Sequence, residues 1–192
     1  MAKVYIDTEL LLFATKSREN EEQFNALLSG HQPFLSDLVI AEVHNLEEQF
    51  RHWVGEFLEK NPMPVIKVNE ESIEFARKYV YNKVIEMKDF AIGLHYAIAS
   101  LKGIDIVFTP SDKWVELYEG FKRINEHFNV SAPEIRKVDV KEIPKSSLEE
   151  IRVKIARLLE AQGTTRLFKA IIESQELFFK EKGFRLTRIE KI

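Results

Sequence analysis

The stretch MKDFAIGLHYAIASLKGIDIVFT, residues 87 to 109, decides the fold class of this chain. Between Phe90 and Leu101 its apolar residues recur at helical spacing, and Gly103 marks the end of that helix. Residues 104 to 108 form an almost uninterrupted apolar run, which is typical of a strand buried on both faces. A helix followed by such a strand is half of a βαβ unit, so the stretch predicts an α/β fold with a parallel sheet.

The alternation of strands and helices continues on both sides of this stretch. Short strands are predicted at residues 3–8, 33–36 and 65–68, each followed by a helical pattern, and a last short strand is predicted at 127–130. The clearest apolar stripe predicts one helix over residues 38–60. We therefore expect a three-layer α/β/α domain around a short, mainly parallel sheet of four or five strands.

The pattern changes after residue 132. Residues 138–143 are consistent with a linker strand or an extended arm, and Ser147 with Glu150 forms a capping-box sequence before a helix. A second helix is predicted from about residue 165 to 182. We divide the chain into an α/β domain, residues 1–130, and a C-terminal helical hairpin extension with a basic tail, residues 131–192.

Composition narrows the possible chemistry. The chain has 192 residues, is 45% hydrophobic and contains no cysteine, which excludes disulfides, thiolate metal sites and cysteine nucleophiles and agrees with a reducing cytoplasm. We see no secretion leader and no apolar run near the roughly 18 residues that a membrane span needs, so we expect a cytoplasmic protein without membrane partners. No His-x-x-x-His pair, phosphate-binding Gly-rich loop or Gly-x-Ser-x-Gly elbow is present.

Four acidic residues stand at the ends of predicted elements. Asp7 follows the first strand, Glu42 lies on the inward face of a helix, Asp89 precedes a helix and Asp112 follows the last long strand. The carboxyl ends of parallel strands meet at one edge of the sheet, where we expect these side chains to converge. Converging carboxylates repel unless a cation joins them, so the set predicts a site for Mg²⁺ or Mn²⁺.

Each acid also has a simpler explanation. Asp7 and Asp89 are suitable helix caps, and TPSD at residues 109–112 fits a capping signature with proline at the first helical position. Glu42 lies near a helix start, where the helix dipole favours a carboxylate. We expect His44, His52 and His95 to be structural or exposed rather than catalytic.

Five short stretches occur in a fixed order: VYIDT (4–8), FLSDLVIAE (34–42), VIKV (65–68) with Ala76, KDFAIGLHYAIA (88–99) and IVFTPSD (106–112). Each is short, but their order, spacing and strand-helix setting resemble the PIN-domain family of metal-dependent nucleases over roughly residues 1 to 130. The resemblance implies a three-layer α/β/α fold and endoribonuclease activity of the kind found in VapC-type toxins.

The resemblance also implies roles for particular residues. Asp7, Glu42, Asp89 and Asp112 match the acidic positions of the family, and either Thr109 or Ser111 matches its hydroxyl. With an RNA substrate, metal-assisted hydrolysis would leave a 5′-phosphate, with Asp7 and Asp89 as the preferred direct ligands. An antitoxin-like protein partner and a homodimer are further expectations from the family.

RNA binding requires cations near the acidic edge, and the basic C-terminal region is the obvious source. Candidates for phosphate contacts are Arg152, Arg157, Arg166, Arg185, Arg188 and Lys191. The hairpin could instead pack against the α/β domain or a second copy. A rival hypothesis for the whole chain is a non-catalytic PIN-like RNA-binding or scaffold module, whose acids no longer bind metal.

Overall fold

The computed structural model describes residues 1–183 of the chain. In chain order its elements are β1 (Ala2–Ile6), α1 (Thr8–Thr15), α2 (Arg18–Leu28), β2 (His31–Ser36), α3 (Asp37–His44), α4 (Glu48–Lys60), β3 (Val65–Ile66), α5 (Glu70–Tyr81), the 3-10 turn η1 (Met87–Asp89), α6 (Phe90–Leu101), β4 (Ile106–Thr109), α7 (Asp112–His127), β5 (Glu134–Lys137) and α8 (Leu148–Lys182). The stretch at residues 87–109 forms the expected helix and strand.

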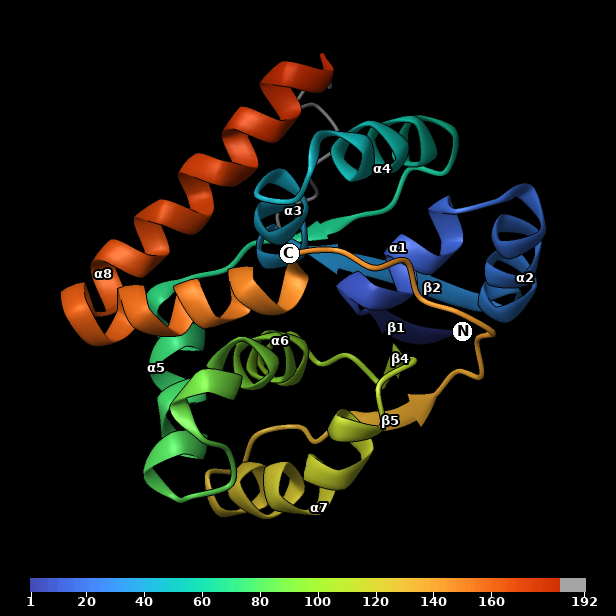
Figure 1. The fold of residues 1–192 in the computed structure, drawn as a ribbon. Helices are drawn as coiled ribbons and strands as arrows, with labels where there is room; N and C mark the ends of the chain where they lie inside the picture. The colour runs from blue at the N-terminus through green and yellow to red at the C-terminus, as the bar shows by residue number, and fades with distance from the viewer. Residues whose placement is uncertain (184–192) are drawn as a thin grey trace.

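The sheet has five parallel strands in the order β3-β2-β1-β4-β5. The central strand β1 is fully buried at Val4, Tyr5 and Ile6 because helices cover both faces of the sheet. Figure 1 shows α1 to α4 on one side of the sheet and α5 to α7 on the other. The α/β prediction with a short parallel sheet and a C-terminal helical extension is confirmed. All carboxyl ends of the strands lie at one edge, which positions the site described below.

The predicted helix over residues 38–60 is in fact two helices. The break occurs at Asn45, which follows α3 and whose side-chain amide donates to the Ala41 carbonyl at 2.8 Å and to Ser174 Oγ at 3.2 Å. The backbone N–H of Asn45 also donates to the Ala41 carbonyl at 3.3 Å, so the side chain and the backbone of Asn45 together fix the end of α3. The apolar periodicity runs through the break because both helices bury residues against the same core.

The predicted strand at residues 127–130 is wrong, since α7 continues to His127 and the chain then turns. The buried side chain of Asn125 explains this: its Nδ2 donates to the Ser131 carbonyl, while its backbone carbonyl accepts from Val130 at 2.9 Å. These contacts curl residues 128–131 around the helix end. The fifth strand is instead β5, which pairs in parallel with β4.

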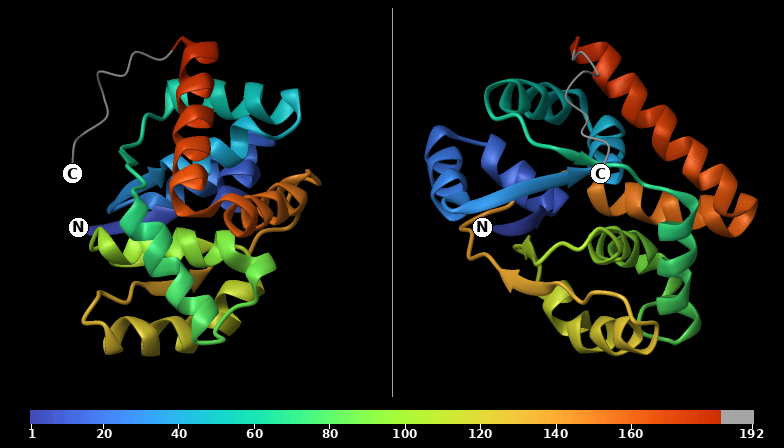
Figure 2. Two further views of the ribbon diagram at one scale, coloured as in Figure 1. Left: turned by 90° about the vertical axis from the view of Figure 1, so that its left-hand side faces the viewer. Right: turned by 180° about the vertical axis from the view of Figure 1, so that it is seen from behind.

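Helix α8 bends sharply at Gly163, where φ is 81° and ψ is −177°. We call residues 148–162 the first arm and residues 164–182 the second arm. The first arm lies across the carboxyl edge of the sheet between α3 and α6, and the second arm runs away along α3 toward α4 (Figures 1 and 2). The predicted capping box is not formed, because Ser147 makes no side-chain cap bond.

Candidate active site

Three of the predicted site residues meet at the carboxyl edge of the sheet. Asp7 follows β1 and caps α1, where its Oδ1 accepts from the backbone of Glu9 at 3.0 Å. Thr109, the last residue of β4, donates its hydroxyl to Asp7 Oδ2. Glu42 projects from α3 into the same region, and Asp7, Glu42 and Thr109 are all fully buried. Asp7 is therefore both a helix cap and a member of the site.

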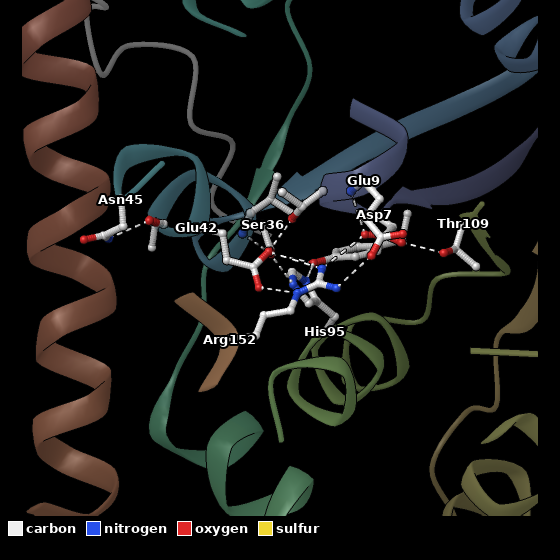
Figure 3. A network of polar contacts seen from close by, with 12 residues as sticks. Asp7, Glu9, Ser36, Glu42, Asn45, His95, Thr109 and Arg152 are labelled. Atoms are coloured by element: carbon white, nitrogen blue, oxygen red, sulfur yellow. Dashed lines mark hydrogen bonds and ion pairs between the residues drawn. The ribbon is translucent and has the colours of Figure 1, made fainter. Parts of the chain in front are cut away.

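The guanidinium of Arg152, from the first arm, lies among these acids (Figure 3). Its Nε donates to Glu42 Oε1 at 2.9 Å, its Nη2 to Asp7 Oδ1 at 3.3 Å, and its Nη1 to Glu9 Oε1 at 3.4 Å. The Arg152 side chain is only 3% exposed. One buried cation thus joins three carboxylates, which offsets the repulsion expected between them.

A second set of contacts orients Glu42 from its other side. Its Oε2 lies 2.9 Å from His95 Nε2 and also accepts the Thr8 hydroxyl. Because a carboxylate only accepts, His95 Nε2 carries the proton in this contact. His95 Nδ1 lies 2.6 Å from the Tyr5 hydroxyl, which continues at 2.6 Å to Ser36. Glu42 is therefore held by a buried polar chain from four elements.

The electrostatics of the two glutamates differ. Burial alone would raise the pKa of Glu42, but the charge of Arg152 and the contacts with His95 outweigh burial and lower this pKa to about 2. Burial and the negative charge of Asp7 raise the pKa of Glu9 to about 7 against the opposing effect of Arg152. The pKa of Arg152 is raised, because the attraction of Glu42 and Asp7 exceeds the desolvation that would lower it. Glu42 is ionised at neutral pH, and its negative charge is balanced by Arg152.

The other predicted site residues lie elsewhere along the edge. Asp89 is 8% exposed and pairs with the Lys113 ammonium, whereas Asp7 and Glu42 share the Arg152 guanidinium. The Asp112 side chain is 75% exposed and pairs with Lys137 at 2.6 Å. Among the two candidate hydroxyls, the structure joins Thr109 to Asp7.

Ser111 stands beside this contact without entering it. Its backbone N–H donates to Thr109 Oγ1 at 3.1 Å, and its side chain makes no cap bond to α7. The catalytic role of either hydroxyl stays a prediction.

The predicted phosphate-contacting residues have varied settings. Arg157 is exposed on the first arm, and Arg166 pairs with Glu173 at 3.6 Å on the second. Arg185 and Arg188 lie outside the described residues, so their role stays a prediction. Arg152 is not available for a phosphate contact in this structure, because its side chain is buried in the acidic site; here the alternative, packing against the α/β domain, holds.

Sequence reasoning missed Arg152 and His95 as partners of Glu42, although a signal for Arg152 was present. Leu148, Arg152, Ile155 and Leu159 recur at helical spacing, so Arg152 lies on the apolar stripe of the first arm just as Glu42 lies on that of α3. Two opposite charges on two buried stripes indicate a buried ion pair. For His95, an apolar helix offers no comparable sign, since α6 is buried on nearly every side.

The donor chemistry of Asp7 and Glu42 fits a hard divalent cation. Mg²⁺ commonly uses one or two carboxylates and retains several waters, and one guanidinium already bridges these two carboxylates. Within residues 1–183, however, no three His, Asp or Glu side chains are arranged as a metal site. The two carboxylates therefore fit such an ion only where Arg152 does not occupy the space between them.

Comparisons with known proteins bear on the fold. No family model and no curated protein matches the sequence. A solved structure described as VapBC2 from Rickettsia felis bound to a DNA fragment from their promoter contains a chain that matches with a TM-score of 0.50 and 16% identity, covering 71% of this chain and 99% of that chain. At this identity the likeness concerns the fold. Among the described helices, none combines the length and apolar character needed to cross a membrane.

Proposed function

We propose that this chain is a metal-dependent endoribonuclease of the PIN type. The observation that carries the proposal is the burial of Asp7 and Glu42 side by side at the carboxyl edge of a parallel sheet, with Thr109 bound to Asp7. Ligand sites of parallel α/β folds lie at this edge. The likeness of the fold to a chain of a VapBC2 structure supports the same class of protein.

In this proposal, Asp7 and Glu42 would hold Mg²⁺ or Mn²⁺. Asp89, which pairs with Lys113 in this structure, would have to leave that pair to act as a third ligand. A bound divalent cation supplies activation of a water and neutralisation of charge at the phosphodiester. Thr109 orients Asp7 through its hydroxyl, and His95 with Thr8 fixes the Glu42 carboxylate. These contacts hold the two ligands in one geometry before the substrate arrives, which reduces the reorganisation needed for catalysis.

One observation favours a second function, a non-catalytic RNA-binding or scaffold module. Arg152 already compensates the charge of Asp7 and Glu42, as a permanent structural ion-pair network would. Such a network needs no metal for stability. The two functions differ in whether a divalent cation enters the site.

The test of the nuclease is cleavage of a pooled random-sequence RNA, with mapping of the new 5′ ends. Wild type is compared with Asp7→Asn in Mn²⁺, Mg²⁺ or EDTA. We expect metal-dependent cuts with 5′-phosphates that Asp7→Asn abolishes, because the amide replaces a charged ligand.

The matched control is Asp139→Asn, the same change at an exposed position, which should cleave like wild type. Circular dichroism verifies that each variant is folded. Cleavage that persists at full rate in folded Asp7→Asn would reject the nuclease and favour the binding module. Absence of cleavage in every metal, both from wild type and from Arg152→Met, which removes the guanidinium between Asp7 and Glu42, would do the same.

Two partners belong to the same proposal. An antitoxin-like protein is supported by the VapBC2 description of the similar structure, and a homodimer by the family resemblance. Size-exclusion chromatography with light scattering measures the mass of the purified chain. A monomer at all concentrations would contradict the dimer without affecting the nuclease.

A further inference from the structure

We propose that the first arm is an intrachain block of the active site, in which the Arg152 guanidinium holds the position of the divalent cation and must withdraw before metal and RNA can bind. The inference rests on the proposed function and concerns the regulation of that same site. It adds a switch made of this chain's own residues.

The contacts of Arg152 place it in direct competition with a metal ion. Its Nε binds Glu42 Oε1 and its Nη2 binds Asp7 Oδ1, so one guanidinium bridges the two carboxylates. The remaining Asp7 oxygen accepts from Thr109, and the remaining Glu42 oxygen from His95 and Thr8. A divalent cation between the two carboxylates would therefore meet a guanidinium bound to the same oxygens. Like charges this close repel strongly away from water, so one cation excludes the other.

The first arm also closes the route to the acids. Asp7 and Glu42 have no solvent-exposed surface, and Arg152 has almost none. Leu148, Ile151, Ala156 and Leu159 are buried along the same arm and hold it against the α/β domain. A phosphodiester that reacts at Asp7 and Glu42 must reach them, so the arm must leave the edge for RNA as well as for metal.

The chain is built so that the first arm can move as a unit. Residues 138–147 before it form neither helix nor strand, and Gly163 after it has a backbone conformation that only glycine adopts readily. The segment 138–147 and Gly163 can therefore act as hinges at the two ends of the first arm.

The second arm has separate anchors. Ser174 bonds Asn45 at 3.2 Å, and Thr165 bonds Glu70 on α5 at 3.3 Å. Release of the first arm therefore does not require release of the second.

The experiment is Mn²⁺ binding to the full chain, measured by calorimetry and by the electron paramagnetic resonance of free Mn²⁺. Wild type is compared with Arg152→Met, which keeps the length of the side chain and removes its charge. We expect Arg152→Met to bind Mn²⁺ about ten-fold or more tightly, because the affinity of wild type is reduced by the fraction of molecules with a free site.

Two controls assign the gain. Lys154→Met removes a positive charge at an exposed position of the same arm and should bind Mn²⁺ like wild type. Asp7→Asn combined with Arg152→Met should lose the gain, because a metal ligand is removed. Equal Mn²⁺ affinity of wild type and Arg152→Met, or binding by neither, would overturn the inference.

A second measurement needs no variant. Hydrogen exchange of wild-type residues 148–162 is followed across a series of Mn²⁺ concentrations, with Mg²⁺ as a parallel series. We expect exchange to rise in the first arm and to stay constant in residues 164–182. If Arg152→Met fails to fold, this measurement decides alone, and unchanged exchange in the first arm would refute the block.

RNA cleavage by the same proteins separates this inference from the proposed function. Tight Mn²⁺ binding by Arg152→Met without cleavage would retain the block and reject the nuclease. Cleavage by wild type and Arg152→Met at the same rate and the same Mn²⁺ dependence would retain the nuclease and reject the block. Faster cleavage by Arg152→Met, at lower Mn²⁺, is the outcome expected if both hold.

Discussion

The two halves of the acidic edge contain the same kinds of residue but differ in their electrostatic state. Asp7 and Glu42 are fully buried, and both pair with the buried guanidinium of Arg152. Asp112 is largely exposed and pairs with Lys137 on the surface, and Asp89 pairs with Lys113 at the boundary between the two. The difference shows that burial decides how strongly an acid depends on its partner. A buried carboxylate is costly to ionise without a partner, whereas an exposed carboxylate is stabilised by water.

The largest effect is expected where the buried pair is broken. Glu42→Gln removes the charge that faces Arg152 and leaves the guanidinium with weaker compensation in a site closed to water. We expect the free energy of unfolding to fall by about 3 to 5 kcal/mol, the usual cost of leaving one member of a buried ion pair without its partner. Urea unfolding of wild type and variant measures this loss.

Combining Glu42→Gln with Arg152→Met turns the measurement into a double-mutant cycle. We expect the double variant to be less destabilised than the sum of the two single variants. Each single variant leaves one buried charge without its partner, whereas the double variant removes both charges. Glu160→Gln, at an exposed position of the first arm, is the control and should unfold like wild type. If the losses of unfolding free energy in the two single variants simply add in the double variant, Arg152 and Glu42 are not coupled, which would contradict their direct contact in the structure.

The next effect concerns the hinge that places the first arm over the buried half. Gly163→Ala forces a non-glycine residue into φ 81° and ψ −177°, although no atom lies within 4 Å of the added Cβ. We expect a loss of about 1 to 3 kcal/mol from backbone strain alone. Urea unfolding measures the loss, and hydrogen exchange locates it in residues 148–162. Gly55→Ala lies in regular helix and clashes only with the flexible Lys182 side chain, so a similar loss there would contradict strain as the cause.

Asp37 tests the comparison between buried and exposed acids, because it is buried but does not pair with an arginine within residues 1–183. Burial raises its pKa from 3.8 to about 6, although Lys67 and a bond from the Val68 backbone oppose the shift. The folded state therefore binds more protons than the unfolded state between these two values, and stability falls as pH rises through this window. Above pH 6 the folded protein carries a buried charge that Lys67 and the Val68 N–H compensate only in part.

Asp37→Asn should remove this pH dependence. It keeps an acceptor for the Val68 N–H and carries no charge, so we expect a gain of about 1 to 2 kcal/mol at pH 8 and little change at pH 4. Unfolding curves at the two pH values measure the difference. An equal effect of the substitution at both pH values would mean that the Asp37 carboxyl titrates normally.

The sequence predicts the fold well because the fold depends on periodicity. The buried stretch at residues 87–109 and the apolar runs at residues 4–6 and 34–35 form the elements expected from their spacing. The errors arise where one side chain outweighs the local pattern. Asn45 divides a continuous apolar stripe into two helices, and Asn125 curls a strand-like segment around a helix end. Each amide bonds to a backbone carbonyl within six residues, and a pattern of apolar spacing carries no information about such a bond.

The candidate site is predicted less completely, because its contacts join distant parts of the chain. The position of Asp7 at a strand end and of Glu42 on an apolar stripe identifies them as inward acids. The cation that joins them comes from Arg152, more than 100 residues away, and only the three-dimensional fold selects it among the basic residues of the C-terminal region. Charge counts therefore predict that a basic region faces an acidic edge, but not which arginine enters the site.

The smallest effect is expected at the exposed half of the edge. Lys137→Met removes the partner of Asp112, but both side chains are hydrated and ordinary salt screens their attraction. We expect no measurable change in the thermal unfolding midpoint, and none in the Mn²⁺ affinity of Arg152→Met when the two changes are combined. Lys141→Met, at an even more exposed ion pair, is the control. A clear change in Mn²⁺ affinity with Lys137→Met would instead place Asp112 in the electrostatic field of the metal, and the two halves of the edge would then act as one site.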